Sequence, residues 1–193
     1  MSYPLNITRK QFEEPKGLKC FPFASGRWVT HFAEVVGIEI SHGKVTDFLV
    51  IKGQNKQGDT GYGVRISVSL NPNFVPNDWQ DREGQIARNA ERLTKILKAF
   101  DLAVFDDSGA WLLPERFDSA IGKVFSFSII GAEMDGQPVY TDRGHQKTFV
   151  AFRGIANTLL PVVMPPDAAG ERPVSSCALN SYNASASFGE EVA

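Results

Sequence analysis

The chain has 193 residues, of which 42% are hydrophobic and 22% are charged, and its formal net charge is −2. This composition suits one folded domain with extensions, and it excludes a polyanion binder that relies on a strongly basic overall charge. No apolar stretch approaches the roughly 18 to 20 residues that span a bilayer, and the N-terminus lacks a charged segment followed by an apolar run, so we expect no membrane contact and a cytoplasmic location, in the host cell if the protein is viral.

The charge is unevenly distributed. Residues 1–160 carry 19 Lys and Arg against 18 Asp and Glu, whereas residues 161–193 carry 1 against 4. The body is therefore close to neutral and the C-terminal part is acidic. Any nucleic-acid binding must depend on a local cluster of cations and on stacking rather than on the overall charge.

Extended patterns dominate the first half of the chain. Residues 1–27 are interrupted by prolines and glycines and are expected to form an N-terminal arm that lies over the domain. Three extended stretches follow at about residues 28–40, 45–52 and 62–70. In the third, apolar residues alternate with small or polar ones, which predicts one buried and one solvated face. The polar, glycine-rich stretch 53–61 predicts a loop.

The first extended stretch changes parity within its length. Its apolar pattern slips around Val35, Val36 and Gly37. An extra residue or a glycine bend at this point would curve a long strand so that it serves both sides of a barrel.

The second half of the chain contains one amphipathic helix, predicted at about residues 85–100, and two more extended stretches at about 123–133 and 147–155. Three strands, a helix and two strands is the order of the OB-fold, a five-stranded, partly open barrel. We therefore expect a mainly β, OB-fold-like barrel over residues 28–160, with the helix closing one end. OB-folds bind oligonucleotides and oligosaccharides on the face of strands 2 and 3 and on the loops between strands 1 and 2 and strands 4 and 5.

The last extended stretch is the most informative for function. Lys147, Phe149 and Arg153 share one parity, and since two long cations do not suit the inside of a barrel, this set is expected to face outward. An exposed ring beside cations suits a single-stranded nucleic acid, because bases stack on it at about 1 to 3 kcal/mol per base while the cations contact phosphates. The alternative is that the arm or the loops cover Phe149.

The connection 135–147, between the fourth and fifth strands, is long for a hairpin. It is the ligand-binding loop of the expected barrel, with a solvated hairpin tip as the alternative interpretation. Arg65 on the third strand, with Lys52 and Lys56 at the adjoining loop, would extend a positive track, although each alone could be an ordinary surface charge. The candidate nucleic-acid-binding residues are Lys52, Lys56, Arg65, Tyr140, Arg143, His145, Lys147, Phe149 and Arg153.

Signatures of enzymes are absent from the sequence. There is no phosphate-binding loop, no zinc-protease motif and no serine-hydrolase motif. His31, His42 and His145 do not have the spacing of metal ligands. We therefore predict no catalytic residue, no metal site and no cofactor.

Four features carry a resemblance to a known family: the strand order, the helix segment 90–100 ahead of a short acidic turn, the tripeptide Ile121–Gly122–Lys123 before the fourth strand, and the C-terminal tail 161–193. Over roughly residues 24–156 the chain resembles the single-stranded DNA-binding proteins of tailed bacteriophages. The resemblance implies an OB-fold and sequence-tolerant binding of single-stranded DNA during phage DNA replication and recombination. In that family an acidic tail with a terminal aromatic residue recruits polymerase or recombination partners.

The tail of this chain is rich in Pro, Ser and Ala, which predicts a flexible segment. Phe188 and Glu190–Glu191 match part of the family's tail, and Val192–Ala193 follow them. Replication or recombination proteins are therefore the partners expected at the tail. Unpaired barrel edges would also allow a homodimer or a cooperative filament on DNA.

In a second hypothesis, from a different functional class, the chain is a non-catalytic β-barrel interaction protein that binds or inhibits a protein partner. Aromatic residues on its loops, Trp79, Trp111 and Tyr140, would then be the anchors.

Overall fold

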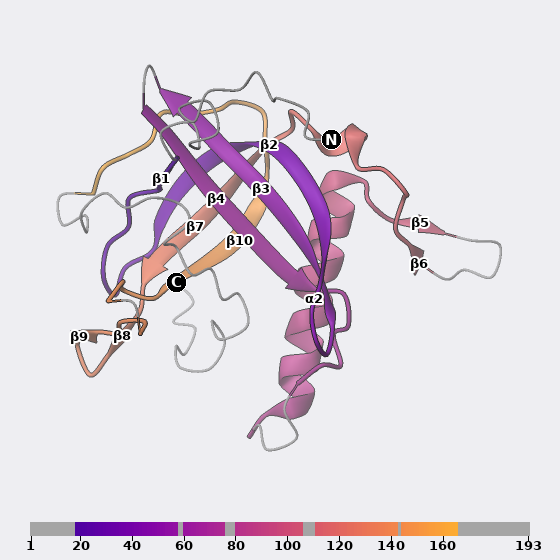
Figure 1. Cartoon of the computed structure of the whole chain (residues 1–193), viewed down its shortest axis with the longest axis horizontal. Helices are drawn as coiled ribbons and strands as arrows, with labels where there is room; N and C mark the ends of the chain where they lie inside the picture. The colour runs from indigo at the N-terminus through magenta and orange to yellow at the C-terminus, as the bar shows by residue number, and fades with distance from the viewer. Residues whose placement is uncertain (1–17, 58–59, 76–79, 106–110, 143, 166–193) are drawn as a thin grey trace, which may run out of the picture.

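The computed structural model describes residues 18–57, 60–75, 80–105, 111–142 and 144–165. These residues are mainly β: six strands form one sheet, and they include one long helix. Figure 1 shows that the sheet curls into a half-barrel. Along the sheet the strands follow the order β1-β4-β3-β2-β7-β10. Their bounds are β1 Lys19–Cys20, β2 Val29–His42, β3 Asp47–Gln57, β4 Thr60–Ser69, β7 Val124–Gly131 and β10 Thr148–Ala156.

The remaining elements are short, apart from the helix. They are α2 Arg82–Phe100, the ladder of β5 Val104–Phe105 with β6 Trp111–Leu112, the 3-10 turn η1 Asp118–Ala120, and the ladder of β8 Glu133–Met134 with β9 Gln137–Pro138. The five long strands and the helix occur in the order that the sequence predicts. The main sheet has six strands rather than five, because β1 pairs in parallel with β4, with Lys19 opposite Tyr62.

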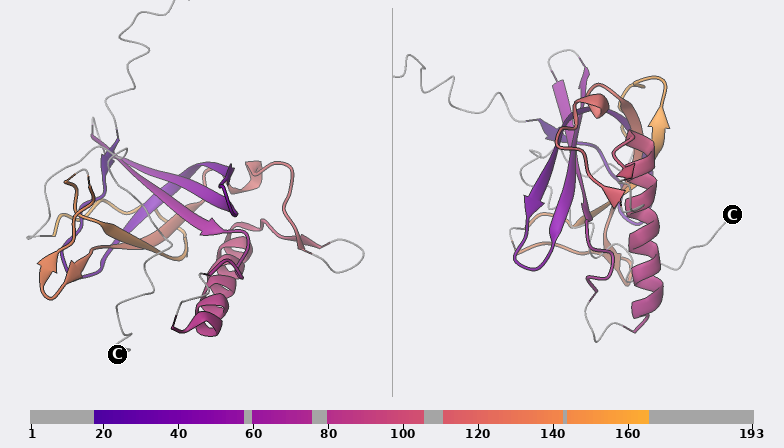
Figure 2. Two further views of the ribbon diagram at one scale, coloured as in Figure 1. Left: turned by 60° about the horizontal axis from the view of Figure 1, so that its bottom comes forward. Right: turned by 90° about the vertical axis from the view of Figure 1, so that its right-hand side faces the viewer.

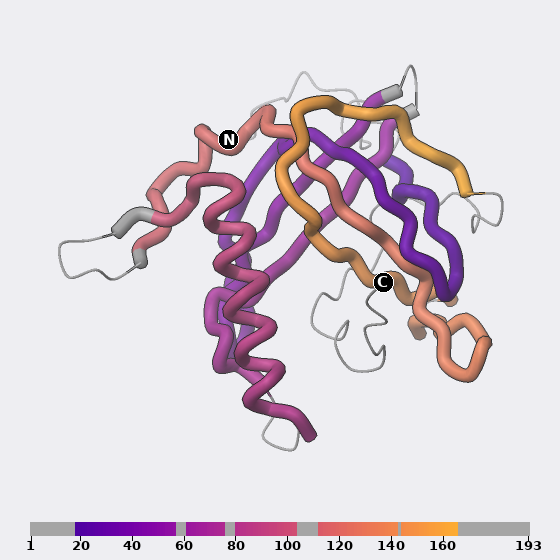
Figure 3. Tube along the Cα trace, turned by 180° about the vertical axis from the view of Figure 1, so that it is seen from behind, coloured from indigo at the N-terminus to yellow at the C-terminus, as the bar shows by residue number. Residues whose placement is uncertain are grey.

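The long central strand β2 joins two layers. Its first half, from Val29 to Glu34, pairs with β7, and from Glu34 onward it pairs with β3. Strands β3 and β4 form the front layer in Figure 1, whereas Figure 3, seen from behind, has β7 and β10 in front, and Figure 2 agrees with this separation. Among the described residues β10 contacts β4 without a pairing ladder between them. Helix α2 contacts both of these strands, so it covers the open side of the half-barrel.

One core lies between the two layers. Tyr62, Val64, Ile66 and Val68 are buried while Arg65 is exposed, which confirms the alternation predicted for this strand. The aromatic residues of the core come from all sides, and the largest buried ones include Phe21, Phe23, Phe100, Phe125 and Phe127. Because both layers bury their inner faces in this one core, their outer faces point to opposite sides of the molecule.

The predicted irregularity in the first strand is confirmed as a β-bulge. Val35 lies opposite Gly53 and Gly37 lies opposite Lys52, so Val36 is the extra residue of β2. The backbone of Val35 is held by the segment before β7: its N–H donates to the carbonyl oxygen of Lys123 at 2.9 Å, and its own carbonyl accepts from Gly122 N at 2.9 Å. The bulge occurs where β2 passes from one layer to the other.

The prediction of a loop over residues 53–61 is wrong. Strand β3 continues to Gln57 and β4 starts at Thr60, so most of this polar stretch is paired. Asn55 explains how a polar residue fits there, since its buried side-chain amide donates at 2.9 Å to the carbonyl oxygens of Phe32 and Leu160. Polarity alone predicted a loop because these long-range acceptors are invisible in the local sequence.

Core residues occur on both sides of the predicted domain boundaries. Phe21 and Phe23 are buried, although they belong to the expected arm, and the backbone beside them pairs with Gly131, whose N–H donates to the carbonyl oxygen of Ala24 at 2.8 Å. At the other end Val162 packs against the core, although it belongs to the expected tail. The rest of the arm, residues 1–17, and of the tail, residues 166–193, lies outside the described residues.

Helix α2 packs against the apolar core through its C-terminal half, where Ile96, Leu97 and Phe100 are buried. The N-terminal half extends beyond the sheet (Figures 1 and 2), and Gln85 is the residue buried there. At the C-terminus Asp101 adopts a left-handed conformation, and Lys123 Nζ donates to its carboxylate at 2.7 Å. No helix in the described parts of the chain is long and apolar enough to cross a membrane.

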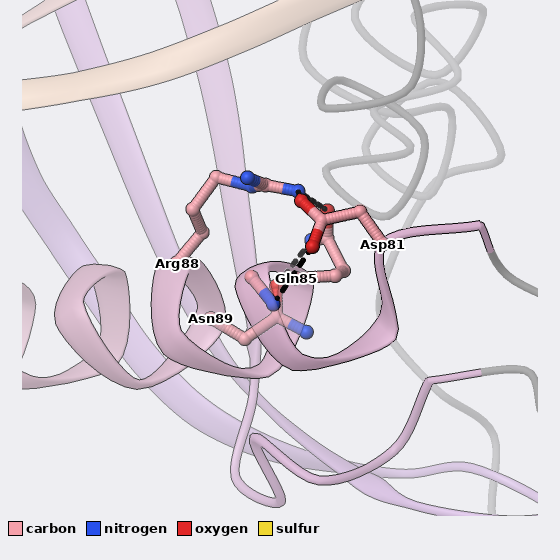
Figure 4. A network of polar contacts seen from close by, with 5 residues as sticks. Asp81, Gln85, Arg88 and Asn89 are labelled. Atoms are coloured by element: carbon pink, nitrogen blue, oxygen red, sulfur yellow. Dashed lines mark hydrogen bonds and ion pairs between the residues drawn. The ribbon is translucent and has the colours of Figure 1, made fainter.

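The projecting end of α2 is closed by its own polar contacts, which Figure 4 shows. Asp81 caps the helix by accepting from Gly84 N at 3.1 Å, and Arg88 Nη2 donates to its other oxygen at 3.0 Å. Gln85 Nε2 donates to Asn89 Oδ1 at 2.8 Å. Such a cap satisfies backbone donors that have no partner within the helix.

Candidate functional site

Strand β10 presents the outward set that the sequence predicts. Thr148, Val150 and Phe152 are buried, whereas Lys147 and Arg153 are exposed and Phe149 is half-buried. The outward orientation is therefore confirmed for the two cations, and Phe149 shares their side of the strand with part of its surface covered. The first residues of β2, together with β7 and β10, form an outer surface that we call the β10 face. We define it by Trp28, Thr30, Ser128, Lys147, Phe149 and Arg153.

Arg153 connects the strands of the β10 face. The pairing of β10 with β7 shifts between Phe152 and Gly154, so Arg153 is an extra residue outside the ladder. Its Nε donates to Ser128 Oγ at 2.9 Å, and its Cζ lies 5.4 Å from the centre of the Trp28 ring. This is the geometry of a cation–π contact.

The polar groups beneath Arg153 hold this arrangement in place. Ser128 Oγ lies 2.9 Å from Thr30 Oγ1, so a chain of hydrogen bonds crosses from β10 through β7 to β2. Trp28 keeps 41% of its surface exposed. Among the described residues, neither Arg153 nor Lys147 forms an ion pair with a carboxylate. The β10 face therefore offers an exposed indole and two cations that have no carboxylate partner in the part of the chain that the structure describes.

Trp28 is a residue that the sequence reasoning missed. It directly precedes β2 and shares the parity of the exposed Thr30, which is the one local signal that it faces outward. Trp28 contacts Arg153, which is far away in the chain. A local sequence pattern does not reveal contacts between residues that are distant in the sequence.

The connection between β7 and β10 is folded rather than an open loop. Tyr140 forms a bridge with Gln146, Thr141 N donates to the carbonyl oxygen of His145 at 2.7 Å, and Lys147 N donates to Val139 at 2.7 Å. Tyr140 is 57% exposed and His145 is half-buried. The structure thus places these two predicted residues in the segment that leads into Lys147. Arg143 lies outside the described residues.

The other predicted cations lie on the opposite side of the molecule. Lys52 on β3 and Arg65 on β4 are directly opposite each other and exposed, and Lys56 is exposed farther along β3. We call this surface the β3–β4 face and define it by Glu39, Lys52, Lys56 and Arg65. Lys52 Nζ lies 2.6 Å from Glu39 Oε2, and Arg65 Nη2 lies 3.7 Å from Glu39 Oε1. Six of the nine predicted residues therefore divide between the two faces, with Lys147, Phe149 and Arg153 on one and Lys52, Lys56 and Arg65 on the other. Tyr140 and His145 lie in the connection between β7 and β10, and Arg143 lies outside the described residues.

His31 and His42 lie in different environments. His31 is buried between Phe21 and Phe127, and its Nε2 lies 2.7 Å from the carbonyl oxygen of Pro22. Burial lowers the pKa of His31, against the opposing effect of this hydrogen bond. His42 instead lies at the surface, with its Nδ1 3.1 Å from Asp47. No group of three or more His, Cys, Asp or Glu among the described residues could hold a metal ion.

Comparison with known proteins adds no relative to these observations. No family model matches the chain, and no match was found among curated proteins or among solved structures. Functional inference therefore depends on the two faces themselves.

Proposed function

We propose that the chain is a non-catalytic, sequence-tolerant single-stranded DNA-binding protein, and that its half-barrel is an OB-fold. This is the function that the resemblance to bacteriophage replication and recombination proteins implies. Two features support the fold assignment: the order of three long strands, a helix and two long strands, and a curled sheet that remains open between β4 and β10 in the described residues.

The observation that carries the proposal is the contact of Arg153 with Trp28 on the β10 face. An indole exposed over 41% of its surface provides a stacking surface for a base, and every base has such a face whatever its sequence. The guanidinium, 5.4 Å from the ring centre and without a carboxylate partner among the described residues, is placed to contact a phosphate next to the stacked base.

Lys147 and Phe149 extend this surface along β10. Lys147 is an exposed cation, and Phe149, which is half-buried, lies two residues farther along the same side of the strand. A strand lying along β10 would therefore meet alternating aromatic and cationic groups. Each stacked base contributes about 1 to 3 kcal/mol, and each neutralised phosphate makes the affinity depend on salt.

The proposal is tested by titrating the full chain with a fluorescent oligothymidine and with duplex DNA of equal length, over a range of salt concentrations. Arg153→Gln should weaken binding and reduce the slope of log K against log salt by about 0.7, the value for one phosphate contact on a single strand. Arg116→Gln is the matched control, since Arg116 is exposed and lies outside both faces. No binding of oligothymidine by the wild-type chain would refute the function.

A protein-binding role is the second candidate. Its support is the connection between β7 and β10, where Met134 is 70% exposed and Tyr140 is 57% exposed. Aromatic and methionine side chains are enriched at the centres of protein interfaces. Tryptophan emission separates the two candidates, because oligothymidine should quench it only if a base stacks on an indole. Of the other proposed anchors, Trp79 and the side chain of Trp111 lie outside the described residues.

A further inference from the structure

The β3–β4 face contains a carboxylate that bridges two cations. One oxygen of Glu39 lies 2.6 Å from Lys52 Nζ and the other lies 3.7 Å from Arg65 Nη2. The side chains of Glu39, Lys52 and Arg65 are 44%, 46% and 47% exposed. The bridge is therefore open to solvent, and a molecule in solution has access to both cations.

The bulge in β2 puts Glu39 in this position. With Val36 as the extra residue, Glu39 lies opposite Val50 and on the same side of the sheet as Lys52. Without the extra residue the register that starts with Glu34 opposite Gln54 would place Glu39 opposite Leu49, which faces the core together with Ile51. A one-residue slip turns a strand's side chains to the other face, so the bulge is what turns this carboxylate outward.

Two like charges directly opposite each other, as Lys52 and Arg65 are, destabilise a sheet. Glu39 relieves that repulsion, which is a purely structural role. Exposed ion pairs are weak, however, at about 0.2 to 1 kcal/mol, so the bridge does not prevent another anion from exchanging with the carboxylate. Its two oxygens contact two cations in the way that two oxygens of a phosphate group would.

We propose that Lys52 and Arg65 form a phosphate-binding site on the β3–β4 face, and that Glu39 occupies this site in the free protein as an internal competitor. Where the incoming phosphate belongs to DNA, the inference rests on the function proposed above. The two faces then bind a strand differently: the β10 face accepts bases and phosphates directly, whereas a phosphate reaches Lys52 and Arg65 only by displacing Glu39.

Removal of the competitor should strengthen phosphate binding. Glu39→Gln keeps the shape of the side chain and removes its charge. Since the displaced pair contributes about 0.2 to 1 kcal/mol, inorganic pyrophosphate should bind about 1.4- to 5-fold more tightly to this variant. Glu34→Gln is the matched control, because this substitution changes the net charge by the same amount. Glu34 lies exposed on the same strand and has no ion pair among the described residues.

The experiment is a calorimetric titration of the full-length variants with pyrophosphate at low salt, with thermal melting curves to confirm that each variant folds. We expect tighter binding for Glu39→Gln and not for Glu34→Gln. In a Lys52→Gln/Arg65→Gln background, Glu39→Gln should have no effect, since the site that it competes for is gone. Equal effects of the two glutamate substitutions, or an effect that survives in the double variant, would overturn the proposal.

Parallel titrations with oligothymidine and with an abasic oligomer separate this inference from the proposed function. If pyrophosphate shows the expected pattern while neither oligomer binds, the phosphate site stands and the DNA-binding function fails. If oligothymidine binds with equal affinity to the wild type and to Glu39→Gln, and pyrophosphate shows no difference, the function stands and the inference fails. Both are supported if Glu39→Gln tightens binding of both oligomers.

Discussion

The two outer faces of the half-barrel carry the same kinds of cation in different environments. On the β10 face Arg153 lies over an indole and donates to a serine, and no carboxylate pairs with it among the described residues. On the β3–β4 face Lys52 and Arg65 share the carboxylate of Glu39. The position of a cation on a strand therefore does not establish whether the cation is available to bind an anion. A partner from a neighbouring strand decides whether an incoming anion meets a free charge or a neutralised one.

Trp28 gives the most direct test of the difference between the two faces. Trp28→Ala removes the indole, and since one stacked base contributes about 1 to 3 kcal/mol, the affinity for oligothymidine should fall roughly 5- to 150-fold. Fluorescence anisotropy with labelled oligothymidine measures the change. Val45→Ala, an exposed apolar residue in the turn between β2 and β3, serves as the control. Equal affinities of the two variants would remove the β10 face from the binding surface.

The core that separates the two faces is tested at Gly53. A Cβ at this position would lie 2.6 Å from Phe125 Cζ and 3.0 Å from Ala33 Cβ, so Gly53→Ala overpacks the core and should lower the free energy of unfolding by about 1 to 3 kcal/mol. At Gly37 a Cβ would meet only Lys52 Cδ, at 3.8 Å, so Gly37→Ala should leave stability nearly unchanged. Urea unfolding measures both variants. Equal stabilities would mean that the core relaxes around the added methyl group.

The stability of the fold should depend on pH through His31, which is buried beneath the β10 face, opposite Phe127 of β7. Burial lowers the pKa of His31 below its ordinary value of 6.5. The unfolded chain therefore takes up a proton below about pH 6.5 while the folded chain does not, and the free energy of unfolding should fall with falling pH by up to about 1.4 kcal/mol per pH unit.

This pH dependence is measured by urea unfolding at pH 7.5 and pH 5.5. His31→Gln should weaken it, whereas the control His42→Gln, at an exposed position, should retain it. The prediction fails if His31→Gln and the wild type lose stability equally on acidification.

The smallest effect is expected far from both faces, at the projecting end of α2. Asp81→Ala removes the helix cap and the contact with Arg88, at a cost of about 0.5 to 2 kcal/mol in the free energy of unfolding. Binding of oligothymidine and pyrophosphate should be unchanged, because this end of the helix lies beyond the sheet (Figure 2). Glu115→Ala, an exposed carboxylate outside the helix, is the control. A change in affinity for either ligand would contradict the confinement of binding to the two faces.

Local periodicity alone predicted much of the fold. The order and approximate bounds of the five long strands and the helix, the buried side of β4 from Tyr62 to Val68, and the irregularity around Val36 all follow from patterns of neighbouring residues, which the structure confirms. The outward position of Lys147 and Arg153 likewise follows from the alternation of neighbouring residues. These features are readable because side chains of a strand alternate between two faces, and a change of parity marks an extra residue.

Tertiary structure decided how the candidate residues are grouped. The contact of Arg153 with Trp28, the bridge from Glu39 to Lys52 and Arg65, and the paired course of residues 53–57 each join segments that are distant in the sequence. The curl of the sheet then placed the predicted cations on opposite sides of one core. The sequence by itself determined which side of the strand Arg65, Lys147 and Arg153 occupy, because side chains alternate along a strand. Only the packing of the strands determined which charges meet, since the energy of an ion pair depends on the distance between the groups in space.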